Sequence, residues 1–140
     1  MADYYTILSF ELKLPAKALD WIEAEIKNEQ SEKFENKYGS ITGCTFERED
    51  PKTLWISNDE SANVNALSAV IQAALKKFKL NDRVGFEYAF TCSKPRLDAF
   101  GGGATIVTKD GFDYTSTSMW LDKKMKPLPY SVCNKPDWNS

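Results

Sequence analysis

The 140-residue sequence contains no histidine. This absence excludes serine–histidine and cysteine–histidine nucleophiles, imidazole metal ligands and a histidine-based pH switch. Cysteine is scarce as well: Cys44, Cys92 and Cys133 are odd in number and far apart, with no pair at the two-residue spacing of zinc sites. The sequence therefore disfavours an enzyme. It predicts no catalytic residues, no metal site, no cofactor and no disulfide framework.

Long apolar runs are also missing. Charged residues interrupt every apolar stretch well before the ~20 residues that a bilayer-crossing helix needs. The first residues, Met1 to Tyr5, have neither the basic start nor the apolar segment of a secretory signal. We therefore expect a cytoplasmic protein that does not associate with membranes.

The composition, with 42% hydrophobic and 27% charged residues, is typical of a soluble globular domain. We expect one domain over residues 1–126. Residues 127–140 contain three prolines and no regular period, which predicts an extended tail that is either packed on the domain as a strap or mobile.

The net charge of −2 is unevenly distributed along the chain. Residues 1–60 contain 7 basic and 13 acidic residues, a net charge of −6, whereas residues 61–140 contain 11 and 7, a net charge of +4. Such asymmetry can orient a binding partner by long-range attraction. No polybasic stripe is present, so double-stranded DNA is disfavoured as a partner.

Two stretches alternate between apolar and polar residues, which predicts half-buried strands over residues 4–14 and 83–91. Pro15 ends the first of these, and apolar residues at helical spacing predict a helix to about residue 30. Residues 31–43 lose this period and are predicted to form a fraying helix end and a loop.

Turn residues divide the remaining chain. A turn at residues 50–52 predicts a hairpin of strands 44–49 and 53–57. Capping residues at 58–63 precede the clearest helical stripe, which runs from Val64 to Phe78. Asp110-Gly111 predicts a second hairpin, with strands 104–108 and 112–115, and a short helix is expected to start near Thr117 or Ser118.

This order of elements predicts an α+β fold. Two strand–helix–strand units joined by a hairpin favour a ferredoxin-like two-layer sandwich, with a mainly antiparallel sheet, two main helices on one face and an added C-terminal hairpin. Such a fold hosts binding modules, enzymes and regulators alike, so it does not identify a function.

The most site-like stretch is the polar segment 91–104, which is predicted to be a loop between two strands. Lys94 and Arg96 supply positive charge, and three glycines permit close approach of backbone N–H groups to a ligand. We predict an anion- or nucleotide-binding site here. Its candidate residues are Thr91, Cys92, Ser93, Lys94, Arg96, Phe100, Gly101, Gly102 and Gly103.

The same residues also have structural explanations that involve no ligand. The glycines can simply form a bend, and a strand follows them where a phosphate loop would have a helix. Lys94, close to Cys92, could lower the pKa of the Cys92 thiol and so activate it. The sequence has no histidine to act as a base, however, so we expect Cys92 to be an unreactive buried thiol. The acidic residues of segments 47–50 and 59–60 match no calcium loop, and the aromatic residues at 86, 88 and 90 are predicted to face the core and not RNA.

Several motifs of the sequence resemble those of a group of known proteins. Residues 57–63 and 85–89, the sequences TCSKPR at 91–96 and FGGGA at 100–104, and then Thr117 and Trp120, resemble a group of small uncharacterised bacteriophage and mobile-element proteins. The resemblance implies no catalytic residues. It implies a setting in the cytoplasm of a bacterial host, where small acidic phage proteins bind and disable host factors, including immune nucleases or nucleotide signals.

The first functional hypothesis is therefore a non-enzymatic phage-type protein that binds a host protein, as an anti-defence inhibitor of a defence-system component. The alternative is a sponge-like protein that binds an anionic small molecule or nucleotide through Lys94, Arg96 and the glycines. An enzyme of unknown class is the third hypothesis.

Overall fold

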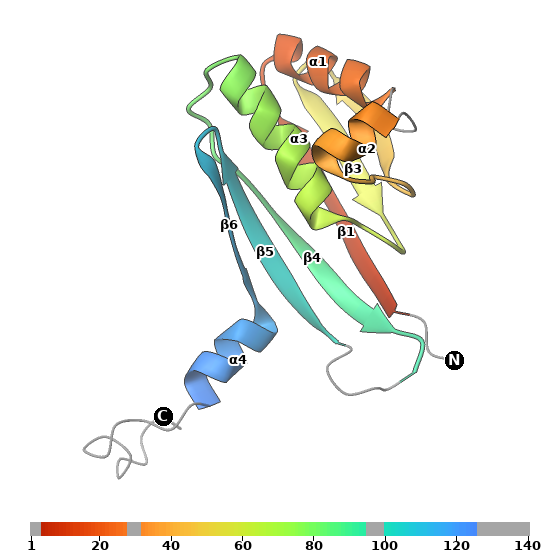
Figure 1. Ribbon diagram of the computed structural model, residues 1–140, viewed down its shortest axis with the longest axis vertical. Coiled ribbons are helices and arrows are strands. Elements are labelled where there is room, and N and C mark those ends of the chain that lie inside the picture. Colours follow the sequence, from red (N-terminus) through yellow and green to blue (C-terminus); the bar gives the residue numbers. More distant parts are fainter. Residues whose placement is uncertain (1–3, 28–31, 95–99, 126–140) are drawn as a thin grey trace, which may run out of the picture.

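A computed structural model describes residues 4–27, 32–94 and 100–125. Within these ranges the fold is α+β, with a single antiparallel sheet and four helices (Figure 1). The predicted extended tail lies outside the described residues, as does Cys133.

Six strands form the sheet, in the order β2-β3-β1-β4-β5-β6. All neighbouring pairs are antiparallel. The strands are β1 (Tyr4–Lys13), β2 (Thr45–Asp50), β3 (Thr53–Asn58), β4 (Val84–Cys92), β5 (Gly101–Thr108) and β6 (Gly111–Ser116). The predicted antiparallel sheet and both hairpins are thus confirmed. The second turn lies one residue earlier than expected, at Lys109-Asp110, because Thr108 pairs with Gly111.

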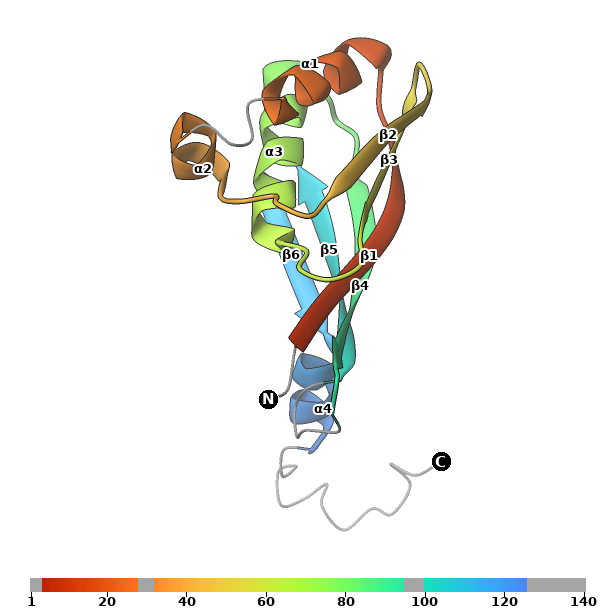
Figure 2. The same cartoon turned by 90° about the vertical axis from the view of Figure 1, so that its right-hand side faces the viewer.

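The helices are α1 (Ala16–Ile26), α2 (Glu32–Tyr38), α3 (Val64–Lys77) and α4 (Thr117–Met125). In Figure 2, α1, α2 and α3 lie on the same side of the sheet, which we call the helix-facing side; the opposite side is the open side. Asn63 caps α3 by accepting a hydrogen bond from the Ala66 N–H at 3.1 Å, as capping chemistry predicts.

Helix α2 corrects the expectation of a loop between residues 31 and 43. Phe34 and Tyr38, four residues apart, are both buried, and their ring centroids lie 4.9 Å apart. The Tyr38 hydroxyl also donates to Glu25 Oε2 of α1 at 3.1 Å. Packing of these two rings therefore stabilises a short helix whose sequence is otherwise charged.

The core lies between α1, α3 and the helix-facing side of the sheet. Leu12 of β1, Leu19 of α1, Ile71 and Leu75 of α3 and Val107 of β5 are all fully buried. Burial of side chains of this size stabilises the fold by about 1.5–3 kcal/mol each.

Strand β1 changes partner along its length. Its first half pairs with β4 as far as Leu8 opposite Tyr88, and its second half pairs with β3. The part of β4 that precedes Tyr88 is not paired with β1, and there the rings of Phe10 and Phe86 stack with their centroids 4.5 Å apart. Helices α1 and α3 cover one end of the sheet, whereas at the other end the first half of β1 and the strands β4, β5 and β6 extend beyond α3 (Figure 1).

Candidate functional site

The predicted site segment joins β4 to β5. Thr91 and Cys92 end β4, where they pair with Tyr5 and Tyr4 of β1. Both residues are half-buried, and the Cys92 thiol is free. Ser93 and Lys94 follow and are exposed. Arg96 lies outside the described residues, so its association with Lys94 stays a prediction.

The glycine triplet lies within β5 and not in a loop, which corrects the predicted bounds of that loop. Gly101, Gly102 and Gly103 pair with Phe90, Ala89 and Tyr88 of β4. The N–H of Gly102 donates to Thr117 Oγ1 at 3.0 Å, so it already has a partner within the protein.

Close packing explains why glycine occupies these positions. A Cβ on Gly103 would lie 2.3 Å from Cε2 of Tyr88, and one on Gly101 would lie 2.7 Å from Thr117 Oγ1. Gly103 therefore lets the Tyr88 ring lie flat over β5, and Gly101 admits the first residue of α4. Phe100, immediately before the triplet, is exposed.

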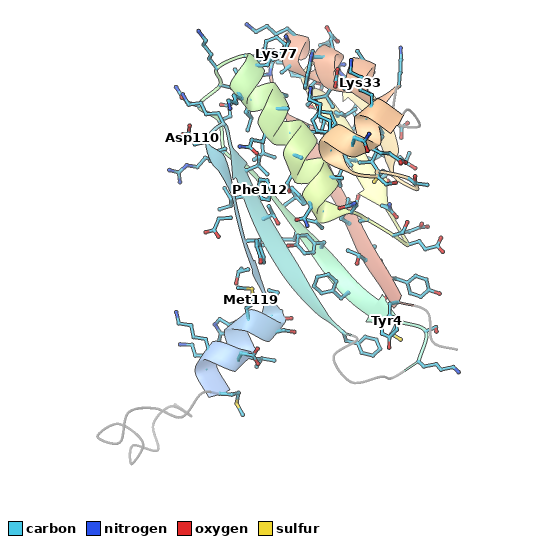
Figure 3. All side chains as sticks on the ribbon, in the orientation of Figure 1. Tyr4, Lys33, Lys77, Asp110, Phe112 and Met119 are labelled. Atoms are coloured by element: carbon cyan, nitrogen blue, oxygen red, sulfur yellow. The ribbon has the colours of Figure 1, made fainter. Side chains whose placement is uncertain are left out.

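Beside the glycines, the helix-facing side of the sheet forms an open groove of about 630 Å³. Strands β4 and β6 contribute the rings of Tyr88, Phe90, Phe112 and Tyr114, and the start of α3 forms one wall. Phe112 and Tyr114 belong to this side because they pair with the buried residues Val107 and Thr105. Figure 3 shows Phe112 on the sheet beside α3.

The groove exists because the strands continue past the point where α3 begins. The sequence correctly grouped Phe86, Tyr88 and Phe90 on one face of β4. Only Phe86 is fully buried, however, while Tyr88 and Phe90 are half-buried and line the groove. Sequence analysis missed this site. The available signal was the glycine triplet, which leaves room for large rings on the neighbouring strand.

Within the part of the chain that the structure describes, no charged residue lines the groove. Its polar groups are hydroxyls and amides, including those of Asn65, Ser68, Thr105 and Ser116. Tyr88 and Thr105 hydrogen-bond to each other through their hydroxyls at 3.0 Å. Hydroxyl and amide groups both donate and accept, so this surface can pair with the polar groups of an uncharged ligand.

Ser68, on α3, also lines the groove and is fully buried. Its Oγ has no hydrogen-bond partner among the described residues. A buried hydroxyl without a partner costs on the order of 1–3 kcal/mol, and such groups are rare in native proteins. Ser68 is therefore the one buried polar side chain of the described chain whose hydrogen-bonding capacity is unused.

A second surface, formed by α4, is apolar and exposed. None of its residues is buried, and the helix projects from the end of the sheet (Figure 1), with Met119 in its first turn (Figure 3). Its large apolar side chains are Met119, Trp120, Leu121 and Met125. Ser116 Oγ accepts a hydrogen bond from the Met119 N–H at 3.1 Å and so fixes the first turn of this helix.

The open side of the sheet carries an acidic patch. Glu11 of β1 and Glu47 of β2 pair with Trp55 of β3 from its two sides, and Glu49 follows on β2. Partial desolvation, then the neighbouring carboxylates of Glu11, Asp50 and Glu47, raise the pKa of Glu49 above its ordinary value. Among the residues that the structure describes, no three acidic or cysteine side chains gather closely enough to hold a metal ion.

We expect Glu49→Gln to stabilise the protein at pH 7. The folded state holds the Glu49 proton more tightly than the unfolded state does, so the ionised carboxylate weakens the fold above the raised pKa. The advantage of the variant should shrink as the pH falls through that raised pKa and vanish below the ordinary value of 4.5. Urea unfolding at pH 7 and pH 3.5 measures both.

The matched control is Glu35→Gln, at an exposed position of α2 away from the patch. An equal gain in the free energy of unfolding for both variants at pH 7 would contradict the conclusion that the acidic patch destabilises the ionised form of Glu49. So would a gain for Glu49→Gln that persists at pH 3.5.

Comparison of the chain with protein-family models, curated proteins and solved structures yields no match. Across the described ranges, each helix is too short or too polar to cross a bilayer. A functional assignment therefore depends on the surfaces of this chain itself.

Proposed function

We propose that the protein acts by binding another protein, without catalysing a reaction, through the exposed apolar surface of α4. The observation that carries this proposal is that α4 is ordered on the sheet yet buries none of its four large apolar side chains. Exposed apolar patches on soluble proteins mark interaction sites, and tryptophan and methionine are enriched at interfaces.

Two further features support the proposal. Strand β6, which leads into α4, is an edge strand of the sheet, so one row of its backbone groups is available to a partner strand. The surface also belongs to the half of the chain with a net charge of +4, whereas residues 1–60 carry −6. A partner with an acidic rim around an apolar centre would fit α4 best, because Lys123 and Lys124 flank its apolar residues.

We take the partner to be a host protein in the bacterial cytoplasm, a component of a defence system, because of the resemblance to phage proteins. In architecture we propose a ferredoxin-like unit made of β1, α1, β2, β3, α3 and β4. The order β2-β3-β1-β4 supports it, since β3 lies between the two strands of the first strand–helix–strand unit, β1 and β2, and β1 lies between the two strands of the second, β3 and β4. The β5–β6 hairpin and α4 are then additions that carry the binding surface.

The test is a capture experiment from bacterial lysate with three forms of the protein. We expect a stoichiometric partner to be retained by the wild type and lost with the double substitution Met119→Ala and Trp120→Ala. The matched control is Ile106→Ala, which removes a side chain of similar exposure (50%, against 59% for Trp120) from β5. It should retain the partner. Failure to recover any stoichiometric protein, or retention by the double variant, would contradict the proposal.

An anionic ligand or nucleotide held by Lys94 and Arg96 is the second candidate function. The exposure of Lys94 at the end of β4 favours it. The Gly102 N–H already donates a hydrogen bond to Thr117, so it is not available to a ligand. Lys94 and Arg96 would therefore have to bind the anion themselves.

A further inference from the structure

We propose that the groove on the helix-facing side of β4, β5 and β6 binds the uncharged heteroaromatic ring of a nucleoside-like ligand. The proposal is independent of protein binding by α4. It also differs from anion binding at Lys94 and Arg96, because the groove is a different site and its ligand is uncharged.

The aromatic side chains supply the stacking surface. Tyr88 and Phe90 come from β4 and Phe112 and Tyr114 from β6, and all four line one groove. The rings of Tyr88 and Phe90 meet edge to face, with centroids 5.6 Å apart, so they present differently oriented surfaces to a ligand. Planar bases stack on such rings with little dependence on sequence, because every base has a π-face.

The size and charge of the groove restrict the ligand further. Its volume of about 630 Å³ falls within the range of pockets that enclose small molecules. Of the described residues, no lysine or arginine lines the groove, so a phosphate group would gain no ion pair with them. We therefore take the part of the ligand that enters the groove to be uncharged.

Ser68 is the second and independent observation. Its Oγ is fully buried at the groove and lacks a partner among the described residues, whereas Tyr88 and Thr105 already satisfy each other. A base edge offers both donors and acceptors, and either would satisfy this hydroxyl. The hydroxyl has no exposed surface in the free protein, so a base edge reaches it only where the neighbouring side chains move apart, and binding would then remove a cost that the free protein bears.

The test uses the intact protein and a defined set of probes: adenosine, guanosine, cytidine and uridine, their 5′-monophosphates, and methyl glucoside as a saturated ring. Binding is measured by titration with detection of backbone amide shifts. We expect at least one nucleoside to bind with a Kd below about 1 mM. Its monophosphate should bind with the same Kd to within about threefold, because none of the described residues that line the groove is a cation.

Three variants localise the binding. Tyr114→Ala removes an exposed ring from the groove and should weaken binding at least fivefold. Ser68→Ala should weaken it about five- to tenfold and yet raise the melting temperature of the free protein, because it removes the unpaired hydroxyl. Trp120→Ala is the matched control, since Trp120 is as exposed as Tyr114 (59% against 61%) but lies on α4. It should leave the Kd unchanged.

Four results would overturn the proposal: no nucleoside bound at 5 mM, a monophosphate bound more than tenfold tighter than its nucleoside, methyl glucoside bound as tightly as the nucleosides, or unchanged binding by Tyr114→Ala. The second result would instead support a charged site at Lys94 and Arg96. None of them bears on protein binding by α4, for which Trp120 and not Tyr114 is the sensitive residue.

Discussion

Replacing Gly103 by alanine is expected to lower the free energy of unfolding by about 1–3 kcal/mol. The new Cβ would lie 2.3 Å from Cε2 and 2.7 Å from Cζ of Tyr88, so the ring has to move. Movement would break the hydrogen bond between the hydroxyls of Tyr88 and Thr105, and it would disturb ring contacts with Phe86 and Phe90. Urea denaturation at neutral pH measures the loss.

Gly85→Ala is the matched control, on the strand paired with β5. A Cβ there would meet Thr105 O at 3.8 Å and Ile106 Cγ1 at 3.9 Å, both ordinary contacts. Its effect should stay within about 0.5 kcal/mol. In a Tyr88→Ala background the cost of Gly103→Ala should largely disappear, since the clashing ring is gone. Equal costs for the two glycines, or the same Gly103 cost without the Tyr88 ring, would show that this packing is not the reason for the glycine.

Asn58→Ala is expected to cost about 2–3 kcal/mol. Asn58 is buried at the end of β3, and its Oδ1 accepts hydrogen bonds from the N–H groups of Glu60 and Ser61, both at 2.9 Å. Its Nδ2 donates to Cys44 Sγ at 3.4 Å. Alanine would leave these donors of the turn without their acceptor.

The consequence reaches beyond the turn, because the same backbone is tied to β1. Thr6 donates to Glu60 O and accepts from the Ala62 N–H, both at 3.0 Å. Loss of Asn58 should therefore increase amide hydrogen exchange at Thr6 and Ala62 as well as lower the global stability. Asn81→Ala, at an exposed asparagine after α3, is the control and should change the stability by no more than about 0.5 kcal/mol. Equal effects of the two substitutions would contradict the role assigned to Asn58.

The sequence predicted the regular elements well because each carries a local signal. Alternation in β1 and β4, the stripe of α3 with its Asn63 cap, and the turn residues of the two hairpins depend only on near neighbours in the chain. Helix α2 was missed for the same reason. Its apolar pair, Phe34 and Tyr38, is stabilised by tertiary packing, and so the charged residues around it concealed the helix.

The candidate site could be predicted only in part. The three glycines were predicted to approach a ligand, and the structure shows them packed against Tyr88 and Thr117. These two residues lie 15 and 14 residues from Gly103 in opposite directions along the chain, so the contacts could not be predicted from the local sequence. Ser68 gave no signal at all, because a serine within a helix is common and its lack of a partner depends on everything packed around it.

By itself, the sequence excluded chemistry that depends on histidine and predicted the face on which each strand is apolar. The tertiary structure alone decided which of those apolar faces are covered. The residue pattern of a strand shows which of its faces is apolar. Whether a helix covers that face depends on where α3 begins relative to the ends of β4, β5 and β6. Because these strands extend past the helix, the same alternation that buries Phe86 leaves Tyr88 and Phe90 in an accessible groove.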